Sequence, residues 1–166
     1  MKELSGLSNL EYLEIEGMYI KERAFKGLNK LIKLVLNFCK ADKLDSEMLK
    51  SQKNKLRFLI IHVLEFDITL DSLKRLKVLS ISGFDNLNCI KSVPTESLEV
   101  LNLNTNLSSM YDETIDQFFE RVNLSDLAQL RFKLTELDYR SKWFSGLTNI
   151  KRLSFFDNEY DSADFL

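Results

Sequence analysis

The 166-residue chain contains little of what shapes most small domains: one proline, five glycines, two cysteines and one histidine. So few prolines and glycines leave few tight turns of the usual kind. Two cysteines are too few for a fold held together by disulfides. The net charge of −2 provides no general attraction to nucleic acid or to a membrane surface, so we expect no nucleic-acid partner.

Long apolar runs are also missing. No segment approaches the roughly 20 consecutive apolar residues that a membrane-spanning helix needs, and the first residues contain no apolar core of the signal-peptide kind. We therefore expect this segment itself to make no membrane contact. No linker or change in composition divides the chain, so residues 1–166 are predicted to form one domain.

One pattern is abundant: L-x-x-L-x-[LIF] occurs seven times, and all 21 of its slots are apolar in a chain that is 45% hydrophobic. The starting positions are 20 to 29 residues apart. That spacing is typical of leucine-rich repeats, which run from roughly 20 to 29 residues. The seven copies begin at Leu10, Leu31, Leu56, Leu76, Leu98, Leu127 and Ile150.

Each copy predicts one short strand followed by a return segment. In the first copy, alternation turns Leu13 and Ile15 inward and leaves Tyr12, Glu14 and Glu16 facing outward. Neither the strand nor the return can bury its apolar side alone, so the copies must stack. The predicted fold class is α/β, a curved leucine-rich-repeat solenoid of about seven repeats. Its parallel sheet lies on the concave side and irregular or helical segments lie on the convex side.

The return segments differ from one another. Residues Asp112 to Val122 place Ile115, Phe118, Phe119 and Val122 at helical spacing, which predicts a helix on the convex side. A shorter helical turn is expected from Asp45 to Lys50, burying Leu44, Met48 and Leu49. The other returns are expected to be irregular.

Two return segments carry a family likeness. Phe25-Lys26-Gly27-Leu28-x-x-Leu31 and Phe144-Ser145-Gly146-Leu147-x-x-Ile150 resemble the F-x-G-L-x-x-L segment of animal extracellular leucine-rich repeats, of which Toll-like receptor ectodomains are the best known. The stretch from Ser97 to Asn106 is similarly close. The resemblance implies a receptor ectodomain at the cell surface that recognises a protein or other macromolecular ligand in innate immunity. It implies no enzymatic activity and no cofactor.

An intracellular alternative stays open. The cysteine-rich caps of such ectodomains are absent, and the repeat spacing runs to both ends, so we expect a fragment of a longer solenoid. Free cysteines and missing caps suit a cytoplasmic scaffold or substrate adaptor, such as the repeats of ubiquitin-ligase adaptors or nucleotide-binding immune sensors. The full-length gene would separate the two hypotheses.

The outward positions of the strands form the predicted binding surface. Its middle is apolar, and such patches mark interaction sites. The alternative is that valine and isoleucine are simply good strand formers, which explains Phe58 least well. Its charges are polarised, with Glu14 and Glu16 on the first strand and basic residues on the last two. The candidate partner-binding residues are Tyr12, Val35, Phe58, Ile60, His62, Val78, Val100, Arg131 and Arg152.

The remaining candidates give no chemistry. His62 has Asn37 and Ser82 as its expected lateral neighbours, and nothing there forms an oxyanion hole, so we interpret it as an exposed or ligand-contacting residue. No cluster has metal-ligand spacing. Cys39 is expected to be buried, and two repeats separate it from Cys89, too far for a disulfide. Of two glycosylation sequons, Asn106 is expected to be buried and unmodified, while Asn123 could carry a glycan if the protein is secreted.

Overall fold

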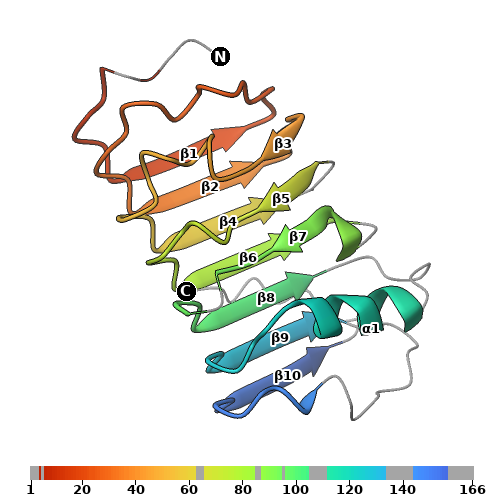
Figure 1. Cartoon of the computed structure of the whole chain (residues 1–166). Helices are drawn as coiled ribbons and strands as arrows, with labels where there is room; N and C mark the ends of the chain where they lie inside the picture. Colours follow the sequence, from red (N-terminus) through yellow and green to blue (C-terminus); the bar gives the residue numbers. More distant parts are fainter. Residues whose placement is uncertain are drawn as a thin grey trace.

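The computed structural model describes residues 4, 6–62, 66–84, 87–94, 96–104, 112–133 and 144–156. The chain forms a parallel-sheet solenoid of about five turns that is mostly strand with little helix. Figure 1 shows the strands of the larger sheet stacked in chain order. The predicted parallel stacking is confirmed.

The larger sheet contains all seven strands that the repeated pattern predicts. Its order is β1-β2-β4-β6-β8-β9-β10, and every neighbouring pair is parallel. The register matches equivalent slots of the pattern, so that Leu34 pairs with Leu59 and Leu79 with Leu101. The strands are β1 (Tyr12–Glu16), β2 (Lys33–Asn37), β4 (Phe58–His62), β6 (Val78–Ser82), β8 (Val100–Asn104), β9 (Gln129–Lys133) and β10 (Arg152–Phe156).

The inward residues of the five central strands form the core. Because alternate residues of a strand face opposite sides, the second and fourth residue of each strand point the same way and stack on their counterparts. All of them are buried: Leu34, Leu36, Leu59, Ile61, Leu79, Ile81, Leu101, Leu103, Leu130 and Phe132. The continuous leucine core is therefore where the pattern predicts it.

The two edge strands depart from that prediction. Leu153 of β10 was expected in the core but is 41% exposed, and Leu13 of β1 and Phe155 of β10 are only partly buried. β1 and β10 are the outermost strands of the described sheet, so each has a neighbouring strand on one side only. An inward side chain on an edge strand therefore lacks half of the lateral packing that covers Leu101.

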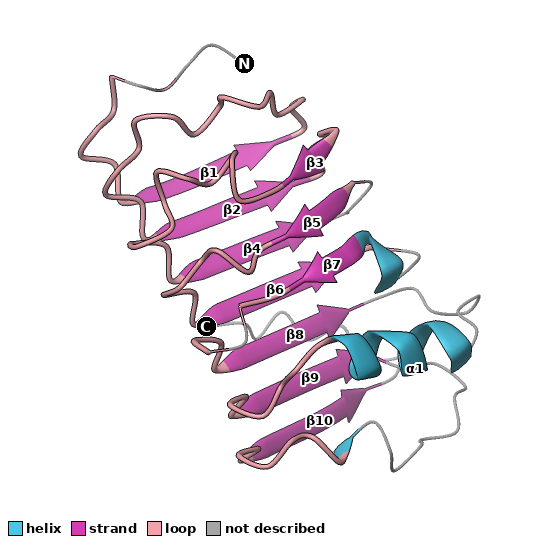
Figure 2. Cartoon of the chain, viewed as in Figure 1, coloured by secondary structure: helices cyan, strands magenta, loops and turns pink. Residues whose placement is uncertain are grey.

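A second, smaller parallel sheet was missed by the sequence analysis, which expected irregular returns. It contains β3 (Lys43–Leu44), β5 (Asp67–Thr69) and β7 (Ile90–Ser92), and β7 directly follows a 3₁₀ turn, η1 (Leu87–Cys89). Figure 2 shows the three short strands stacked beside one another. Each buries one apolar side chain in register: Leu44, Ile68 and Ile90. Strands of two or three residues are too short to show a period of two.

The predicted helix is present as α1 (Asp112–Arg121). It buries Ile115 and Phe118 completely, and Val122 is buried just beyond its end. The ring of Phe119 packs edge-on against Phe132 of β9, with the centroids 6.0 Å apart, so α1 covers the core side of this part of the sheet. Figure 2 shows α1 lying across β9.

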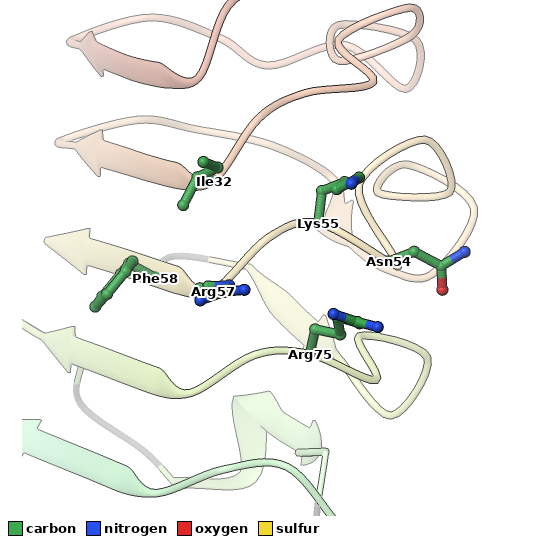
Figure 3. A pocket seen from close by; sticks show the side chains of 6 residues that line it. All are labelled: Ile32, Asn54, Lys55, Arg57, Phe58 and Arg75. Carbon is green, nitrogen blue, oxygen red and sulfur yellow. The ribbon is translucent and has the colours of Figure 1, made fainter.

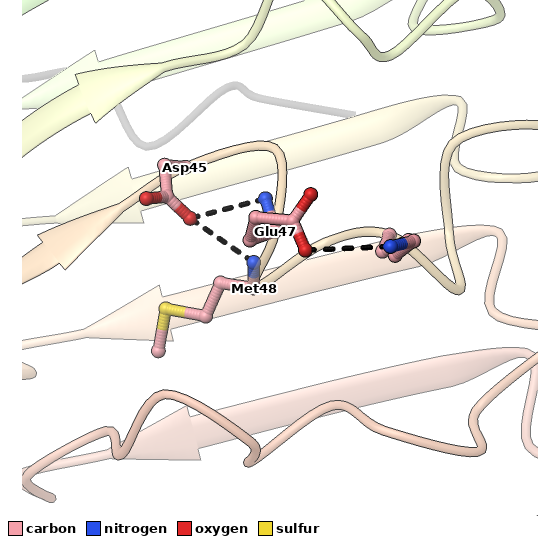
Figure 4. A network of polar contacts seen from close by, with 4 residues as sticks. Asp45, Glu47 and Met48 are labelled. Carbon is pink, nitrogen blue, oxygen red and sulfur yellow. Dashed lines mark hydrogen bonds and ion pairs between the residues drawn. The ribbon is translucent and has the colours of Figure 1, made fainter.

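The segment after β3 forms a hydrogen-bonded turn where we predicted a short helical turn from Asp45 to Lys50. The Asp45 side chain accepts hydrogen bonds from the backbone N–H groups of Glu47 (3.1 Å) and Met48 (3.0 Å), as Figure 4 shows. The backbone N–H of Leu49 donates to the Asp45 carbonyl. The predicted burial of Leu44, Met48 and Leu49 is confirmed. A salt bridge from Lys43 to Asp45 and the turn's own hydrogen bonds lower the pKa of the Asp45 carboxyl group.

The residue after a strand adopts the left-handed conformation at three positions. Gly17 (φ 63°), Phe38 (φ 52°) and Gly83 (φ 67°) follow β1, β2 and β6. Each N–H donates to the carbonyl of the last residue in the next strand, at 2.9 to 3.0 Å. Glycine adopts this conformation freely, whereas in a residue with a side chain it costs about 1–2 kcal/mol of conformational free energy. Phe38 therefore carries strain at a position where two other turns use glycine.

The core position of Leu101 and the edge position of Leu153 provide a matched pair for testing the fold. Leu101→Ala should lower the free energy of unfolding by about 2–5 kcal/mol, because it leaves a cavity at a fully buried site. Leu153→Ala occupies the same slot of the pattern but should cost less than about 1.5 kcal/mol, because its side chain is already 41% exposed. Urea unfolding followed by circular dichroism measures both. Equal losses would contradict the observed packing.

Candidate binding surface

The outward-facing residues of the larger sheet form one surface, which we call the strand face. The strand pairing aligns them in three rows, and the alignment is the one that the repeated pattern predicts. The first row is Tyr12, Lys33, Phe58, Val78, Val100, Gln129 and Arg152, and the second is Glu14, Val35, Ile60, Ser80, Asn102, Arg131 and Ser154. The third begins with Glu16, Asn37, His62, Ser82 and Asn104.

The apolar centre of the strand face is real but less exposed than we predicted. Phe58 is 38% exposed, and its register neighbours Val78 and Val100 are half-buried. Ile60 is also half-buried. Val35, predicted to face solvent, is buried at 6% exposure. It is a short branched side chain that lies between the longer Glu14 and Ile60 in the register. Phe58 is thus the main accessible apolar residue at the centre.

The acidic end of the strand face is a connected network. Both carboxylate oxygens of Glu14 accept hydrogen bonds, one from the Tyr12 hydroxyl (2.6 Å) and one from the Asn37 amide (2.7 Å). The bond to Glu14 raises the pKa of Tyr12. The ammonium group of Lys33 lies 5.2 Å from the centre of the Tyr12 ring. Tyr12 is 47% exposed, so this network presents an aromatic ring to solvent in a fixed orientation.

The basic residues lie at the opposite end of the same face. Arg131 and Lys133 on β9 are half-buried, and Arg152 on the edge strand β10 is exposed. Because β1 and β10 are the two edges of the described sheet, the acidic and basic groups are separated by the full width of the sheet. The structure therefore places Glu14 and Glu16 at one end of the strand face and Arg131, Lys133 and Arg152 at the other, as predicted.

His62 lies where the register predicts it, between Asn37 and Ser82. Its Nδ1 atom is 2.6 Å from the Ser82 hydroxyl oxygen, and the imidazole is exposed. Within the residues that the structure describes, no group of three or more His, Cys, Asp or Glu side chains could hold a metal ion. Among the described residues, the side-chain contact of His62 is thus with Ser82, its neighbour in the third row.

Neither Cys39 nor Cys89 forms a disulfide. Cys39 is buried, as predicted, and its Sγ atom lies 3.4 Å from the Ile15 carbonyl oxygen and 3.5 Å from that of Asn37. It therefore satisfies backbone groups where the chain leaves the sheet, although a thiol is only a weak donor. Cys89 lies in η1, where burial raises the pKa of its thiol to about 11.

The two sequons have different outcomes. Asn106 lies outside the described residues, so its expected burial is not tested. Asn123 is exposed after α1, and its side-chain oxygen accepts a hydrogen bond from the Ser125 N–H at 3.0 Å. Its exposure agrees with the expectation that it could carry a glycan in a secreted protein.

A cluster of exposed side chains beside the strand face was missed. Met18, Tyr19 and Phe38 are 46%, 49% and 60% exposed, and they occupy the turns after β1 and β2. These two turns lie side by side, because the Lys40 N–H donates to the Met18 carbonyl. The tyrosine hydroxyl donates to Asp42 at 2.6 Å. Aligning the copies would have shown Phe38 at the position of Gly17 and Gly83, a signal of a strained and exposed residue.

Comparison of the chain with protein families, with curated proteins and with solved structures gives no match. Among the described residues, no helix has the length and apolar character needed to cross a membrane. The strand face and its surroundings must therefore be interpreted from their own chemistry.

The thiols allow a test of the packing around β2 and η1. In the native protein a disulfide reagent such as DTNB should leave Cys39 unmodified, because it is only 2% exposed. Cys89, with a pKa of about 11, has about 0.1% thiolate at pH 8, so it should react roughly a hundredfold more slowly than a free cysteine. Its rate should rise about tenfold per pH unit until the pH approaches that pKa.

The control for this measurement is the same reaction in denaturing urea, where both thiols should react at the rate of free cysteine. Rapid modification of Cys39 without urea would show that the turn after β2 is not packed as described. A native rate for Cys89 equal to that of free cysteine would contradict its burial.

Proposed function

We propose that this chain is a leucine-rich-repeat recognition module of seven repeats that binds a protein or other macromolecular ligand through its strand face. The observation that carries the proposal is Phe58, an exposed aromatic residue in register with Val78 and Val100 at the centre of that face. An aromatic side chain at the centre of a patch is the kind of residue that dominates binding energies at interfaces. Charged residues at the two ends orient the ligand, which gives specificity more than affinity.

The two F-x-G-L segments favour an extracellular receptor of Toll-like type. Both fold into the same turn: the Leu28 N–H donates to the Phe25 carbonyl and the Leu31 N–H to the Leu28 carbonyl. Leu147 and Ile150 repeat these bonds on Phe144 and Leu147. The shared backbone geometry supports reading them as equivalent parts of one repeat type, and the exposure of Asn123 is compatible with glycosylation.

The lack of a disulfide at Cys39 and Cys89 favours the alternative, an intracellular scaffold or substrate adaptor. Cysteines remain reduced in the cytoplasm, and Cys39 is used as a buried hydrogen-bonding residue. Both alternatives bind a macromolecule through the strand face, so they share one mechanism and differ in compartment and partner.

The size of the strand face limits the affinity of this segment. Three outward residues per strand span roughly 13 Å, and seven strands span roughly 29 Å. The resulting area is about 380 Å², whereas a stable interface takes about 800 Å² from each partner. We therefore expect these residues alone to bind weakly, with the lateral or convex surfaces or further repeats completing the site.

The decisive variant is Phe58→Ala. For a partner isolated by photocrosslinking from a reactive residue placed at Val78, this variant should raise the Kd by at least about fivefold, equivalent to about 1 kcal/mol. Surface plasmon resonance measures the change. Phe38→Ala provides a matched control, because it removes an equally large exposed ring outside the strand face and should leave the Kd unchanged. A partner held tightly and indifferent to Phe58, Ile60 and Val78 would exclude the strand face as its site.

A further inference from the structure

A basic pocket lies beside the strand face, where the chain enters β4 and β6. Its volume is about 340 Å³, and it is lined by Ile32, Asn54, Lys55, Arg57, Phe58 and Arg75. Figure 3 shows that the cationic side chains come from two successive connections: Lys55 and Arg57 from the one leading into β4, and Arg75 from the one leading into β6. Phe58 belongs both to this pocket and to the strand face.

The lining of this pocket is positively charged, although both arginines also border a neighbouring pocket that Glu96 lines. Its lining contains three cationic side chains and no carboxylate. Among the described residues, neither arginine nor Lys55 forms an ion pair. The neighbouring lysines behave differently, since Lys74 pairs with Glu96 at 3.9 Å and Lys77 with Glu99 at 2.5 Å. Lys55, Arg57 and Arg75 are thus three neighbouring cations without an ion pair to any described residue, whereas Lys74 and Lys77 beside them are each paired with a glutamate.

The backbone that carries these side chains is held firmly by the sheet. The N–H groups of Arg57 and Phe58 both donate to the Ile32 carbonyl, at 2.8 and 3.1 Å, and the Lys77 N–H donates to the Arg57 carbonyl at 2.9 Å. Leu56 lies between the first two cations and Leu76 directly follows Arg75, and both leucines are fully buried. The backbone from which these exposed side chains extend is therefore fixed, so the spacing between their starting points is set by the sheet.

The chemistry of the pocket specifies a compact anion with an apolar neighbour. Guanidinium groups match carboxylate oxygens in bidentate geometry, and Lys55 adds a third positive charge. Ile32 and Phe58 supply an apolar wall beside them. A long polyanion would continue onto the next turn, where it would meet Glu96 and Glu99. A volume of about 340 Å³ is near the lower limit for ligand sites, which suits a few side chains.

We propose that this pocket binds an acidic segment of a protein partner. Aspartate or glutamate carboxylates of that segment bind Arg57 and Arg75, with Lys55 adding its charge, and an adjacent apolar side chain packs on Phe58 and Ile32. The site goes beyond recognition through the strand face, because it names the chemistry of one contact and lies where the chain enters β4 and β6. A partner using both surfaces would have its acidic segment next to the residue that covers Phe58.

The test uses a defined probe, the peptide acetyl-Glu-Glu-Phe-Glu-Glu-amide, with acetyl-Gln-Gln-Phe-Gln-Gln-amide as its uncharged analogue. Isothermal titration calorimetry of the full chain at low salt should show binding of the first peptide and at least tenfold weaker binding of the second, roughly the effect of losing charge-assisted hydrogen bonds. The double variant Arg57→Gln with Arg75→Gln should weaken binding of the acidic peptide by about tenfold or more. Added salt should weaken it as well.

The matched control is Lys21→Gln with Arg23→Gln, which removes the same charge from exposed positions outside the pocket and should leave binding unchanged. The charge-reversed variant Arg57→Glu with Arg75→Glu should instead bind acetyl-Lys-Lys-Phe-Lys-Lys-amide. Equal weakening in the control variant, or equal binding of both original peptides, would overturn the proposal. Tighter binding of a single-stranded oligonucleotide of equal charge would assign the site to nucleic acid instead. Phe58 is intact in every variant, so failure here leaves the strand-face proposal standing.

Discussion

The stacking of each inward leucine on its counterpart in the next turn is the contact on which the rest of the structure depends. Leu34, Leu59 and Leu79 follow one another in register, and all three are completely buried. A turn of the solenoid has no other way to hide its apolar side, since it contacts only the turns before and after it. A slip of one residue in any strand would turn its leucines to solvent and its outward residues into the core.

This register also decides how the returns satisfy their polar groups. Because the turns are aligned, a side chain of one turn can donate a hydrogen bond to carbonyls of the preceding one, some of which already accept from a backbone N–H. Gln52 is fully buried, and its amide nitrogen donates to the carbonyls of Phe25 (2.8 Å) and Leu28 (3.1 Å). In the same way, the Ser97 hydroxyl donates to the carbonyls of Leu73 and Leu76, and the Asn149 amide donates to the carbonyl of Ser125. Unpaired buried carbonyls are costly, so these side chains allow the irregular returns to pack closely.

The sequence predicted the parts of the fold that have a period. The seven strands, their register and the helix over Ile115 and Phe118 follow from spacings of two, of three to four, and of 20 to 29 residues. The small sheet was missed because Leu44, Ile68 and Ile90 are isolated apolar residues in strands too short to show alternation.

The sequence-based predictions that failed have a common physical cause. A pattern gives the direction of a side chain but does not show which residues surround it. Val35 faces outward as predicted, yet it is buried between its register neighbours Glu14 and Ile60. Leu153 occupies the slot of a core residue, yet its strand is at the edge of the described sheet. The pocket of Arg57 and Arg75 joins residues from two turns, and only the packed structure shows that their charges stay unpaired.

Separation of roles between inward and outward positions explains how such a regular frame could acquire a specific partner. The leucines must keep their identity to maintain the register, whereas Tyr12, Phe58 and Arg152 can change without altering the core. Phe58 occupies the one position where two surfaces meet, since it begins β4 on the strand face and also walls the basic pocket. A ligand that buries Phe58 on one side therefore brings its flanking residues to Arg57 and Arg75 on the other. The apolar contact would supply most of the affinity and the arginines would select which ligand is accepted, because charged groups discriminate between partners more strongly than apolar ones.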